Sequence, residues 1–245
     1  MKLRVDKLLL QRGVATSRQR AQALILAGKV LVQGQKIEKA GTPVDVDAEI
    51  RLLGEDLKYV SRGGLKLERA LQYWQIDVAG KVCMDVGTST GGFTDCLLQN
   101  GAARVIAVDT GYGQIDFKLR NDPRVHLLER TNARYLTRDR LGEGVDLIAM
   151  DVSFISATLV LPAVIAAGFP HKQGRQIVVL VKPQFEVGRG LVGKHGIVRD
   201  EAAQLAAVEK VRAVLLNQGC NQTQIVDSPI LGAEGNREFL LHGAF

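Results

Sequence analysis

Cysteine is scarce in this sequence, and its few cysteines form no recognisable group. Cys83, Cys96 and Cys220 stand far apart without a CxxC pair, and the four histidines show no ligand spacing with one another or with the cysteines. We therefore expect neither a disulfide framework nor a metal site. A reducing, cytoplasmic environment fits this cysteine usage best.

Long apolar runs are also missing. The longest one, residues 155–169, contains Ser156, Thr158 and Pro162 and falls short of the roughly 20 residues that a membrane-spanning helix needs. The basic N-terminus contains only the short run LLL, which cannot form the core of a signal peptide. We expect no bilayer-spanning segment, and we expect the N-terminus to be retained.

Positive charge is concentrated at one end of the chain. The net charge is +6, whereas residues 1–40 contain nine Lys or Arg against two Asp or Glu, so the rest of the chain is close to neutral. The length of 245 residues allows one large core and one small module. This distribution predicts a small polyanion-binding module joined to a near-neutral body, and a solvated basic face without a specific ligand is the alternative.

The basic segment has the pattern of two helices and a hairpin. Residues 4–14 and 17–28 show helical spacing of apolar side chains, and Thr16 or Ser17 is placed to cap the second helix. Residues 30–37 read as a strand, a Gln-Gly turn and a second strand. The order predicts a small α+β module.

Three motifs in this module resemble the S4 RNA-binding domain. They are R-x-D-K-x-L at residues 4–9, S-R-x-x-A at 17–21 and L-I-x-x-G-x-V-x-V-x-G at 24–34. The resemblance implies binding of structured RNA through its shape and its phosphates, and an unrelated helical adaptor is the alternative. The candidate RNA-binding residues are Arg4, Lys7, Arg12, Arg18, Arg20 and Lys29. Arg18 and Arg20 begin the second helix, where amides and cations can converge on one phosphate.

The remainder of the chain predicts one large α/β domain. Residues 54–61 lack apolar periodicity, so we place the linker there and divide the chain into residues 1–57 and 58–245. Beyond residue 80, helical stretches alternate with apolar runs at 82–87, 104–111, 125–129, 145–153 and 176–183. This alternation predicts a Rossmann-like, doubly wound parallel sheet, which binds ligands where the strand order reverses at the carboxyl ends of its strands.

A glycine-rich loop, DVGTSTGGF at residues 85–93, follows the first of these runs. It does not fit G-x-G-x-x-G, and Asp85 would repel a pyrophosphate but suits a ligand with an ammonium and a sulfonium, which favours S-adenosylmethionine over a dinucleotide. Asp109 is placed to accept hydrogen bonds from the cofactor ribose, or else is a turn former, and Asn132 lies near the expected adenine edge. The candidate cofactor-binding residues are Asp85, Gly87, Thr88, Ser89, Gly91, Gly92, Phe93, Asp109, Asn132 and Asp151.

Four further charged residues are Lys66, Asp151, Lys182 and Glu238. Lys66 stands just before the core, Asp151 and Lys182 end predicted strands, and Glu238 lies on the last predicted strand. Singly, each fits a solvated surface residue. Together they resemble the Lys-Asp-Lys-Glu tetrad of FtsJ-like ribose 2′-O-methyltransferases. With the S4 motifs, the whole chain resembles the TlyA family, historically called haemolysins. The resemblance implies methylation of cytidine in ribosomal RNA, with 23S RNA favoured and 16S RNA as a second target.

The resemblance also implies a role for each of the four. A ribose hydroxyl becomes a good nucleophile when a base removes its proton, and a lysine can be that base when burial and a neighbouring ammonium lower its pKa from about 10.4. Lys182 is the candidate base, Asp151 would orient it, and Lys66 and Glu238 would position the ribose. The segment DVSF at residues 151–154 differs from the D/N-P-P-Y/F motif of enzymes that methylate exocyclic amines, which favours a ribose target.

Two broader alternatives remain open from the residues alone. A membrane-active haemolysin would need an amphipathic or spanning segment, and a ribosome-assembly factor would bind RNA with a vestigial cofactor pocket. The glycine-rich, basic residues 184–199 form either a substrate lid or RNA contact, or an ordinary surface loop. We expect ribosomal RNA or ribosomal subunits as partners, and no membrane.

Overall fold

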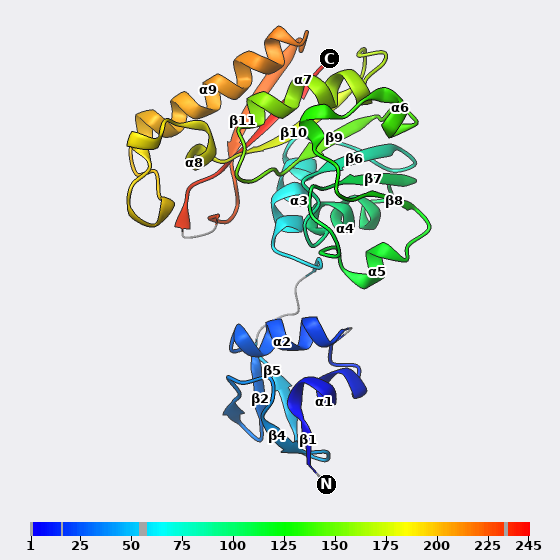
Figure 1. Cartoon of the computed structure of the whole chain (residues 1–245), viewed down its shortest axis with the longest axis vertical. Helices are drawn as coiled ribbons and strands as arrows, with labels where there is room; N and C mark the ends of the chain where they lie inside the picture. Colours follow the sequence, from blue (N-terminus) through cyan, green and yellow to red (C-terminus); the bar gives the residue numbers. More distant parts are fainter. Residues whose placement is uncertain (1, 16, 54–57, 233–234) are drawn as a thin grey trace. The chain divides into compact units, whose positions relative to one another are not determined.

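The computed structural model describes residues 2–15, 17–53, 58–232 and 235–245. The chain divides into two compact units, Met1–Leu57 and Lys58–Phe245, which Figure 1 colours along the sequence. Of the predicted linker, residues 54–57 lie outside the described residues, and residues 58–61 belong to the second unit.

The first unit packs two helices against two small sheets. The helices are α1 (Val5–Gln11) and α2 (Arg18–Leu26). Ser17 caps α2 by accepting a hydrogen bond from the Arg20 amide, and Thr16 lies outside the described residues. The strands are β1 (Lys2–Arg4) paired with β4 (Pro43–Asp45), and β2 (Val30–Val32) between β3 (Gln35–Lys36) and β5 (Ile50–Leu52). The apolar faces of both helices form one core with these strands.

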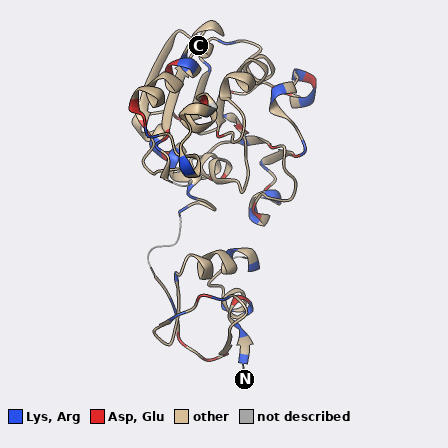
Figure 2. Ribbon diagram, turned by 60° about the vertical axis from the view of Figure 1, so that its left-hand side comes forward, with Lys and Arg blue, Asp and Glu red and all other residues tan. Residues whose placement is uncertain are grey.

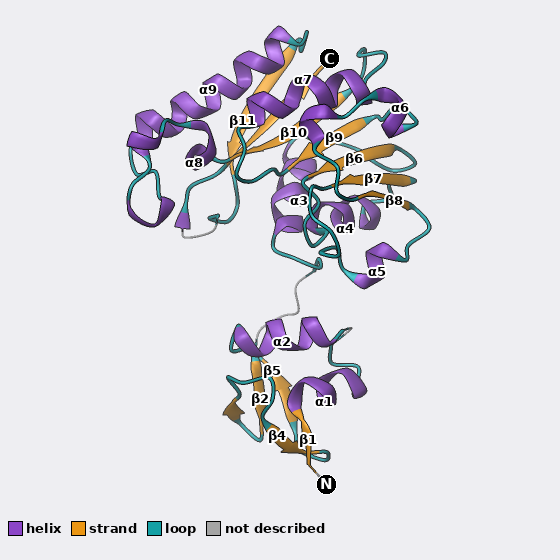
Figure 3. Cartoon of the chain, in the orientation of Figure 1, coloured by secondary structure: helices purple, strands orange, loops and turns teal. Residues whose placement is uncertain are grey.

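The second unit contains one seven-stranded sheet (Figure 3), in the order β11-β12-β10-β9-β6-β7-β8. Its strands are β6 (Val82–Val86), β7 (Arg104–Val108), β8 (Val125–Leu128), β9 (Leu147–Met150), β10 (Gln176–Val181), β11 (Gln222–Asp227) and β12 (Phe239–Ala244). From β8 to β10 neighbouring strands are parallel, and β12 inserts antiparallel between β10 and β11. The predicted doubly wound α/β fold is therefore confirmed.

Helices cover both faces of this sheet. Successive strand residues point to opposite sides, and apolar side chains on each side pack against helices. Met84 packs with α7 (Ala157–Gly168) and α9 (Glu201–Asn217) in one cluster, whereas its neighbour Cys83 packs with α3 and α4 in the other. The remaining helices are α3 (Gly63–Tyr73), α4 (Gly92–Gln99), α5 (Phe117–Arg120), α6 (Arg138–Leu141) and α8 (Pro183–Glu186), with the 3₁₀ turns η1 (Ala133–Tyr135), η2 (Arg189–Leu191) and η3 (Lys194–Gly196). The two apolar layers make the sheet a rigid base for the loops at its edge.

The predicted strands were too long at their carboxyl ends. Residues 87, 109–111 and 151–153 continue the apolar runs in sequence, but in the structure they leave the sheet and form loops. Residues 184–199 also contain the end of α8 and two 3₁₀ turns rather than a single open loop. Within the part of the chain that the structure describes, no helix joins enough length with enough apolar character to cross a membrane.

Candidate active site

Two adjoining cavities open at the carboxyl edge of the sheet, beside β6. The chain runs from β6 outward to β7 and β8 and then returns to the other side of β6 as β9, and this reversal is where such sheets bind ligands. The cavities have volumes of about 280 and 490 Å³. Gly87, Ser89, Asp151 and Ser153 line both of them, so the two spaces meet at these residues.

The smaller cavity brings together two lysines, each paired with a carboxylate. Asp151 and Lys182 directly follow the parallel neighbours β9 and β10, so they emerge side by side, with Lys182 Nζ 2.5 Å from Asp151 Oδ1. Lys66 Nζ, from α3, lies 2.5 Å from Glu238 Oε2. Both lysines line this cavity, which assembles the four residues from four separate segments of the chain.

The two pairs differ in how they face the cavity. Glu238 precedes β12, is buried and does not line the cavity, so it lies behind Lys66. Gly232 is required beside it, because a Cβ there would collide with the Glu238 carboxylate. Asp151 does line the cavity, and its Oδ1 is the atom that contacts Lys182 Nζ. Of the two carboxylates, Asp151 is therefore the one that faces the cavity, whereas Glu238 does not.

The larger cavity is lined by the predicted nucleoside-binding residues Asp109 and Asn132. Asp109 is fixed by backbone amides, since it accepts hydrogen bonds from the amides of Ser89 (2.7 Å) and Gly111 (2.6 Å). A carboxylate has about four acceptor sites, so Asp109 retains capacity for ribose hydroxyls. The side chain of Asn132 accepts a hydrogen bond from the amide of Arg134 and caps η1.

Eight of the ten predicted cofactor residues line the cavities. They are Gly87, Thr88, Ser89, Gly92, Phe93, Asp109, Asn132 and Asp151. Gly91 caps α4 with a φ of 98° and is not in either wall. Asp85 is fully buried beneath the glycine loop, where its Oδ2 accepts hydrogen bonds from the amide (2.9 Å) and hydroxyl (2.6 Å) of Thr94. The expectation of direct contact between Asp85 and a cofactor therefore finds no support in its placement.

Asp85 makes the stability of the fold depend on pH. Burial raises the pKa of Asp85 to about 7, against the hydrogen bonds from Thr94 and with the help of nearby Asp151. The protonated carboxyl group stabilises the folded state, and this contribution is fully present below about pH 4, the ordinary pKa of an aspartate. It is lost as pH rises through the folded-state pKa of about 7. The difference amounts to about 4 kcal/mol. Urea unfolding of the Asp85→Asn variant should show a much flatter dependence between pH 4 and 7 than that of the wild type, and an equally steep one would contradict the assignment.

Sequence reasoning did not identify several residues of the cavity walls. Ser61 and residues 230–232 line the smaller cavity, and Phe154 and Gln114 line the larger one. Neither Ser61 nor residues 230–232 directly follow a predicted strand. The search for ligand-binding residues at the carboxyl ends of strands therefore did not find them. Among the described residues, no group of histidines, cysteines and carboxylates could hold a metal ion.

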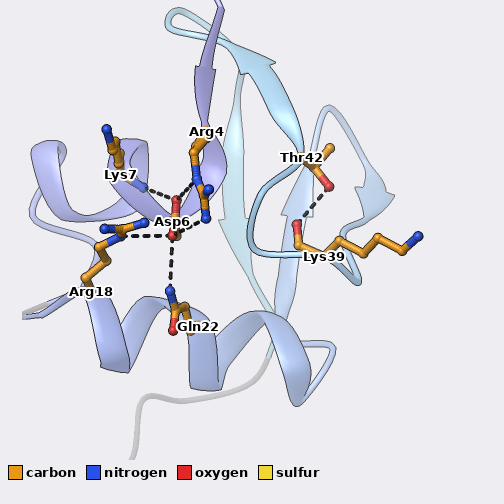
Figure 4. Close-up of polar contacts among 7 residues, drawn as sticks. All are labelled: Arg4, Asp6, Lys7, Arg18, Gln22, Lys39 and Thr42. Atoms are coloured by element: carbon orange, nitrogen blue, oxygen red, sulfur yellow. Dashed lines mark hydrogen bonds and ion pairs between the residues drawn. The ribbon is translucent and has the colours of Figure 1, made fainter.

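Basic residues of the first unit, blue in Figure 2, include Lys2 and Arg4 of β1, Lys7 of α1, and Arg18 and Arg20 of α2. Asp6, which is fully buried, accepts hydrogen bonds from Arg4 (3.0 and 3.1 Å), Arg18 (3.0 Å) and Gln22 (3.2 Å), as Figure 4 shows. Arg4 and Arg18 are about half exposed. A single buried carboxylate thus fixes two arginines at the surface.

The other candidate RNA-binding residues lie around this pair. The side chain of Lys7 is exposed and its amide donates to Asp6. The Arg12 guanidinium donates to the carbonyls of Val46 and Ala48. Arg20 stands in the first turn of α2, and Lys29 precedes β2. The Arg18 side chain donates a hydrogen bond to Asp6, and the convergence of Arg18 and Arg20 on one phosphate stays a prediction.

Removing the Asp6 charge should weaken the first unit. The Arg4 guanidinium holds the pKa of Asp6 well below its usual range, although burial opposes this. The resulting stability is present above pH 4 and is lost as pH falls further. Asp6→Asn should lower the unfolding free energy of this unit by about 1–3 kcal/mol at pH 7, measured by hydrogen exchange of residues 2–52 in the full chain. Asp47→Asn, at an exposed position, is the control and should change it by less than about 0.5 kcal/mol.

Comparisons with known families agree with both units. The FtsJ-like methyltransferase family matches residues 59–245, and the S4 domain matches residues 3–50. These matches leave few residues of the chain unassigned.

Individual relatives align over nearly the whole chain. The 16S/23S rRNA (cytidine-2′-O)-methyltransferase TlyA of Mycobacterium tuberculosis is 47% identical, over 97% of this chain and 88% of its own. The 23S rRNA (cytidine-2′-O)-methyltransferase TlyA of Campylobacter jejuni is 33% identical, over 92% and 93%. A solved structure from Streptococcus thermophilus that carries the name hemolysin is 43% identical, over 99% and 88%, with a TM-score of 0.76. The chain therefore belongs to the TlyA family of FtsJ-like methyltransferases that carry an N-terminal S4 domain.

Proposed function

We propose that this protein is an S-adenosylmethionine-dependent methyltransferase that modifies the ribose 2′-hydroxyl of cytidine in ribosomal RNA. The observation that carries the proposal is the pair of lysine–carboxylate contacts, Lys66–Glu238 and Lys182–Asp151. Both lysines line one cavity, and that cavity joins a second one lined by Asp109 and Asn132. A nucleoside cofactor and a ribose hydroxyl could therefore meet at the shared wall.

The glycine loop and the larger cavity fit such a cofactor. Gly87 has a φ of 87°, and a Cβ there would collide with the Asp151 carbonyl oxygen, so the backbone of β6 and that of β9 approach closely. Asp109 would hold the ribose hydroxyls, Asn132 would lie beside the adenine, and Gly87 to Ser89 would face the rest of the molecule. When bound, the cofactor supplies a methyl group on a cationic sulfur, which leaves as a neutral thioether.

The chain's own residues would prepare the hydroxyl for this transfer. Lys182 Nζ would accept the proton of the 2′-hydroxyl as the new oxygen–carbon bond forms. Asp151, whose Oδ1 lies 2.5 Å from Lys182 Nζ, would orient that lysine towards the hydroxyl. Lys66, fixed by the buried Glu238, would hold the ribose in place. Orientation of this kind accounts for much of the rate gain in bimolecular transfers.

The substrate assignment rests on the family and on the first unit. The names of the two TlyA relatives both include 23S RNA, and one also includes 16S RNA, so we take 23S RNA as the favoured target. The half-exposed Arg4 and Arg18 would contact RNA phosphates, whose recognition positions a protein without reading base sequence.

Radiolabelled methyl transfer to purified ribosomal subunits and to naked 23S and 16S RNA tests the proposal. We expect label in 23S RNA, and mass spectrometry of the digested RNA should locate it on the ribose of a cytidine. Label on a base, or no transfer to any of these RNAs, would overturn the assignment. Calorimetry with S-adenosylmethionine alone tests the cofactor separately.

Gly87→Ala should impair cofactor binding. The substitution adds a Cβ against the Asp151 backbone at a positive φ, so the loop must shift. We expect S-adenosylmethionine affinity to fall about tenfold or more, because a loss of about 1.4 kcal/mol in binding free energy raises the Kd tenfold. Gly80→Ala is the matched control, because Gly80 also has a positive φ but has open space around its Cβ position. Equal affinities of the two variants would contradict the placement of the cofactor against the Gly87 backbone.

A further inference from the structure

Ser153 lies at the junction of the two cavities and contacts Lys182. It stands two residues beyond Asp151 in the loop after β9, and it lines both cavities. Its hydroxyl oxygen lies 2.7 Å from Lys182 Nζ, from which it accepts a hydrogen bond. Of the four residues shared by the cavities, Asp151 and Ser153 are those with a described side-chain contact to Lys182.

The two lysines of the site differ in the chemistry of their partners. Among the described residues, the Lys66 side chain contacts the Glu238 carboxylate, whereas Lys182 contacts a carboxylate and a hydroxyl. An ionised carboxylate only accepts hydrogen bonds, so it suits an ammonium group. A hydroxyl both accepts from an ammonium and donates to the lone pair of a neutral amine. Lys182 thus has a partner suited to either protonation state.

We propose that Ser153 is a positioning residue for Lys182, which holds the lysine nitrogen at the junction of the cavities both before and after it takes a proton. The inference rests on the proposed function, because it matters only if Lys182 exchanges a proton with the target hydroxyl. A general base must lie within hydrogen-bond reach of that hydroxyl. A flexible four-carbon side chain needs a second contact, besides the ion pair, to be restricted to this place.

The test compares Ser153→Ala and Ser153→Thr in single-turnover and steady-state methyl transfer to 50S subunits or 23S RNA. Loss of one hydrogen bond to a charged group should lower kcat about tenfold in Ser153→Ala. KM for RNA and the Kd for S-adenosylmethionine should stay within roughly twofold, because Ser153 is exposed and its partner is Lys182 rather than the backbone. Ser153→Thr keeps the hydroxyl and should recover most of the rate.

A double-mutant cycle with Lys182 distinguishes a positioning role of Ser153 from a general structural effect of its substitution. Adding Ser153→Ala to Lys182→Met should slow transfer no further, because the two residues act as one unit. The control is Thr223→Val, which removes a hydroxyl that accepts a hydrogen bond from the Arg212 side chain (2.8 Å) and which lines neither cavity. An unchanged kcat in Ser153→Ala, or an equal loss with and without Lys182, would overturn the inference. Absence of transfer by the wild type would instead overturn the proposed function.

Discussion

Lys182→Met should reduce methyl transfer to ribosomal RNA by about 10²–10⁴-fold in kcat, the usual contribution of a positioned acid or base. The substitution keeps the apolar part of the side chain and removes the nitrogen that lies between Asp151 and Ser153. Cofactor affinity should change little, because Lys182 lines the smaller cavity and not the larger one. Single-turnover transfer and calorimetry measure the two effects separately.

A lysine-to-alanine change elsewhere controls for the loss of positive charge. Lys172 is exposed and donates to the Gln218 carbonyl, so Lys172→Ala should leave the rate unchanged. Lys182→Arg should also be slow, since a guanidinium stays protonated and cannot accept the proton. If Lys182→Met or Lys182→Arg transferred methyl groups at the wild-type rate, another group would have to be the base.

Lys66→Met should lower both stability and activity, because it leaves Glu238 buried without its cation. Glu238 is 2% exposed and Lys66 11%, and breaking a buried pair on one side costs about 3–5 kcal/mol. Misplacement of the ribose should reduce the rate by about 10²-fold. Urea unfolding and methyl transfer at saturating cofactor give the two values.

Lys66→Met/Glu238→Met distinguishes the two effects. Replacement of a whole buried pair by apolar groups is often neutral in stability, so the double variant should recover most of the lost unfolding free energy. Its methyl transfer should stay as slow as that of Lys66→Met. Recovery of activity along with stability would show that the pair serves only to hold α3 against the segment before β12.

Local patterns were sufficient to predict the five parallel strands of the large sheet and the residues that follow them, but not β11. Asp109, Asp151 and Lys182 each follow a run of apolar residues, and parallel strands bring their carboxyl ends to one edge. Lys66 and Glu238 depended on a resemblance, since nothing in the spacing of residues 66 and 238 links α3 with the start of β12. Their contact spans 172 positions of the chain.

The placement of Asp85 shows that a sequence motif does not specify the direction in which a side chain points. Asp85 and Cys83 point to the same face of β6 because side chains alternate along a strand, and that face packs against α3 and α4. The carboxyl group therefore meets Thr94 of α4 rather than the cavity. Ser153 is the opposite case. A serine that follows a strand carries no signal in the sequence, and its role became visible only from its contact with Lys182, which follows β10.

The insertion of β12 between β10 and β11 has a consequence for the order of folding. Glu238 can reach Lys66 only after β12 has entered the sheet between two strands that precede it in the chain. Contacts at such long sequence separation form slowly, because closing a large loop costs entropy before the contact is gained. The Lys66–Glu238 pair therefore depends on completion of the sheet by its most C-terminal strand, whereas the larger cavity is built from residues that precede this strand.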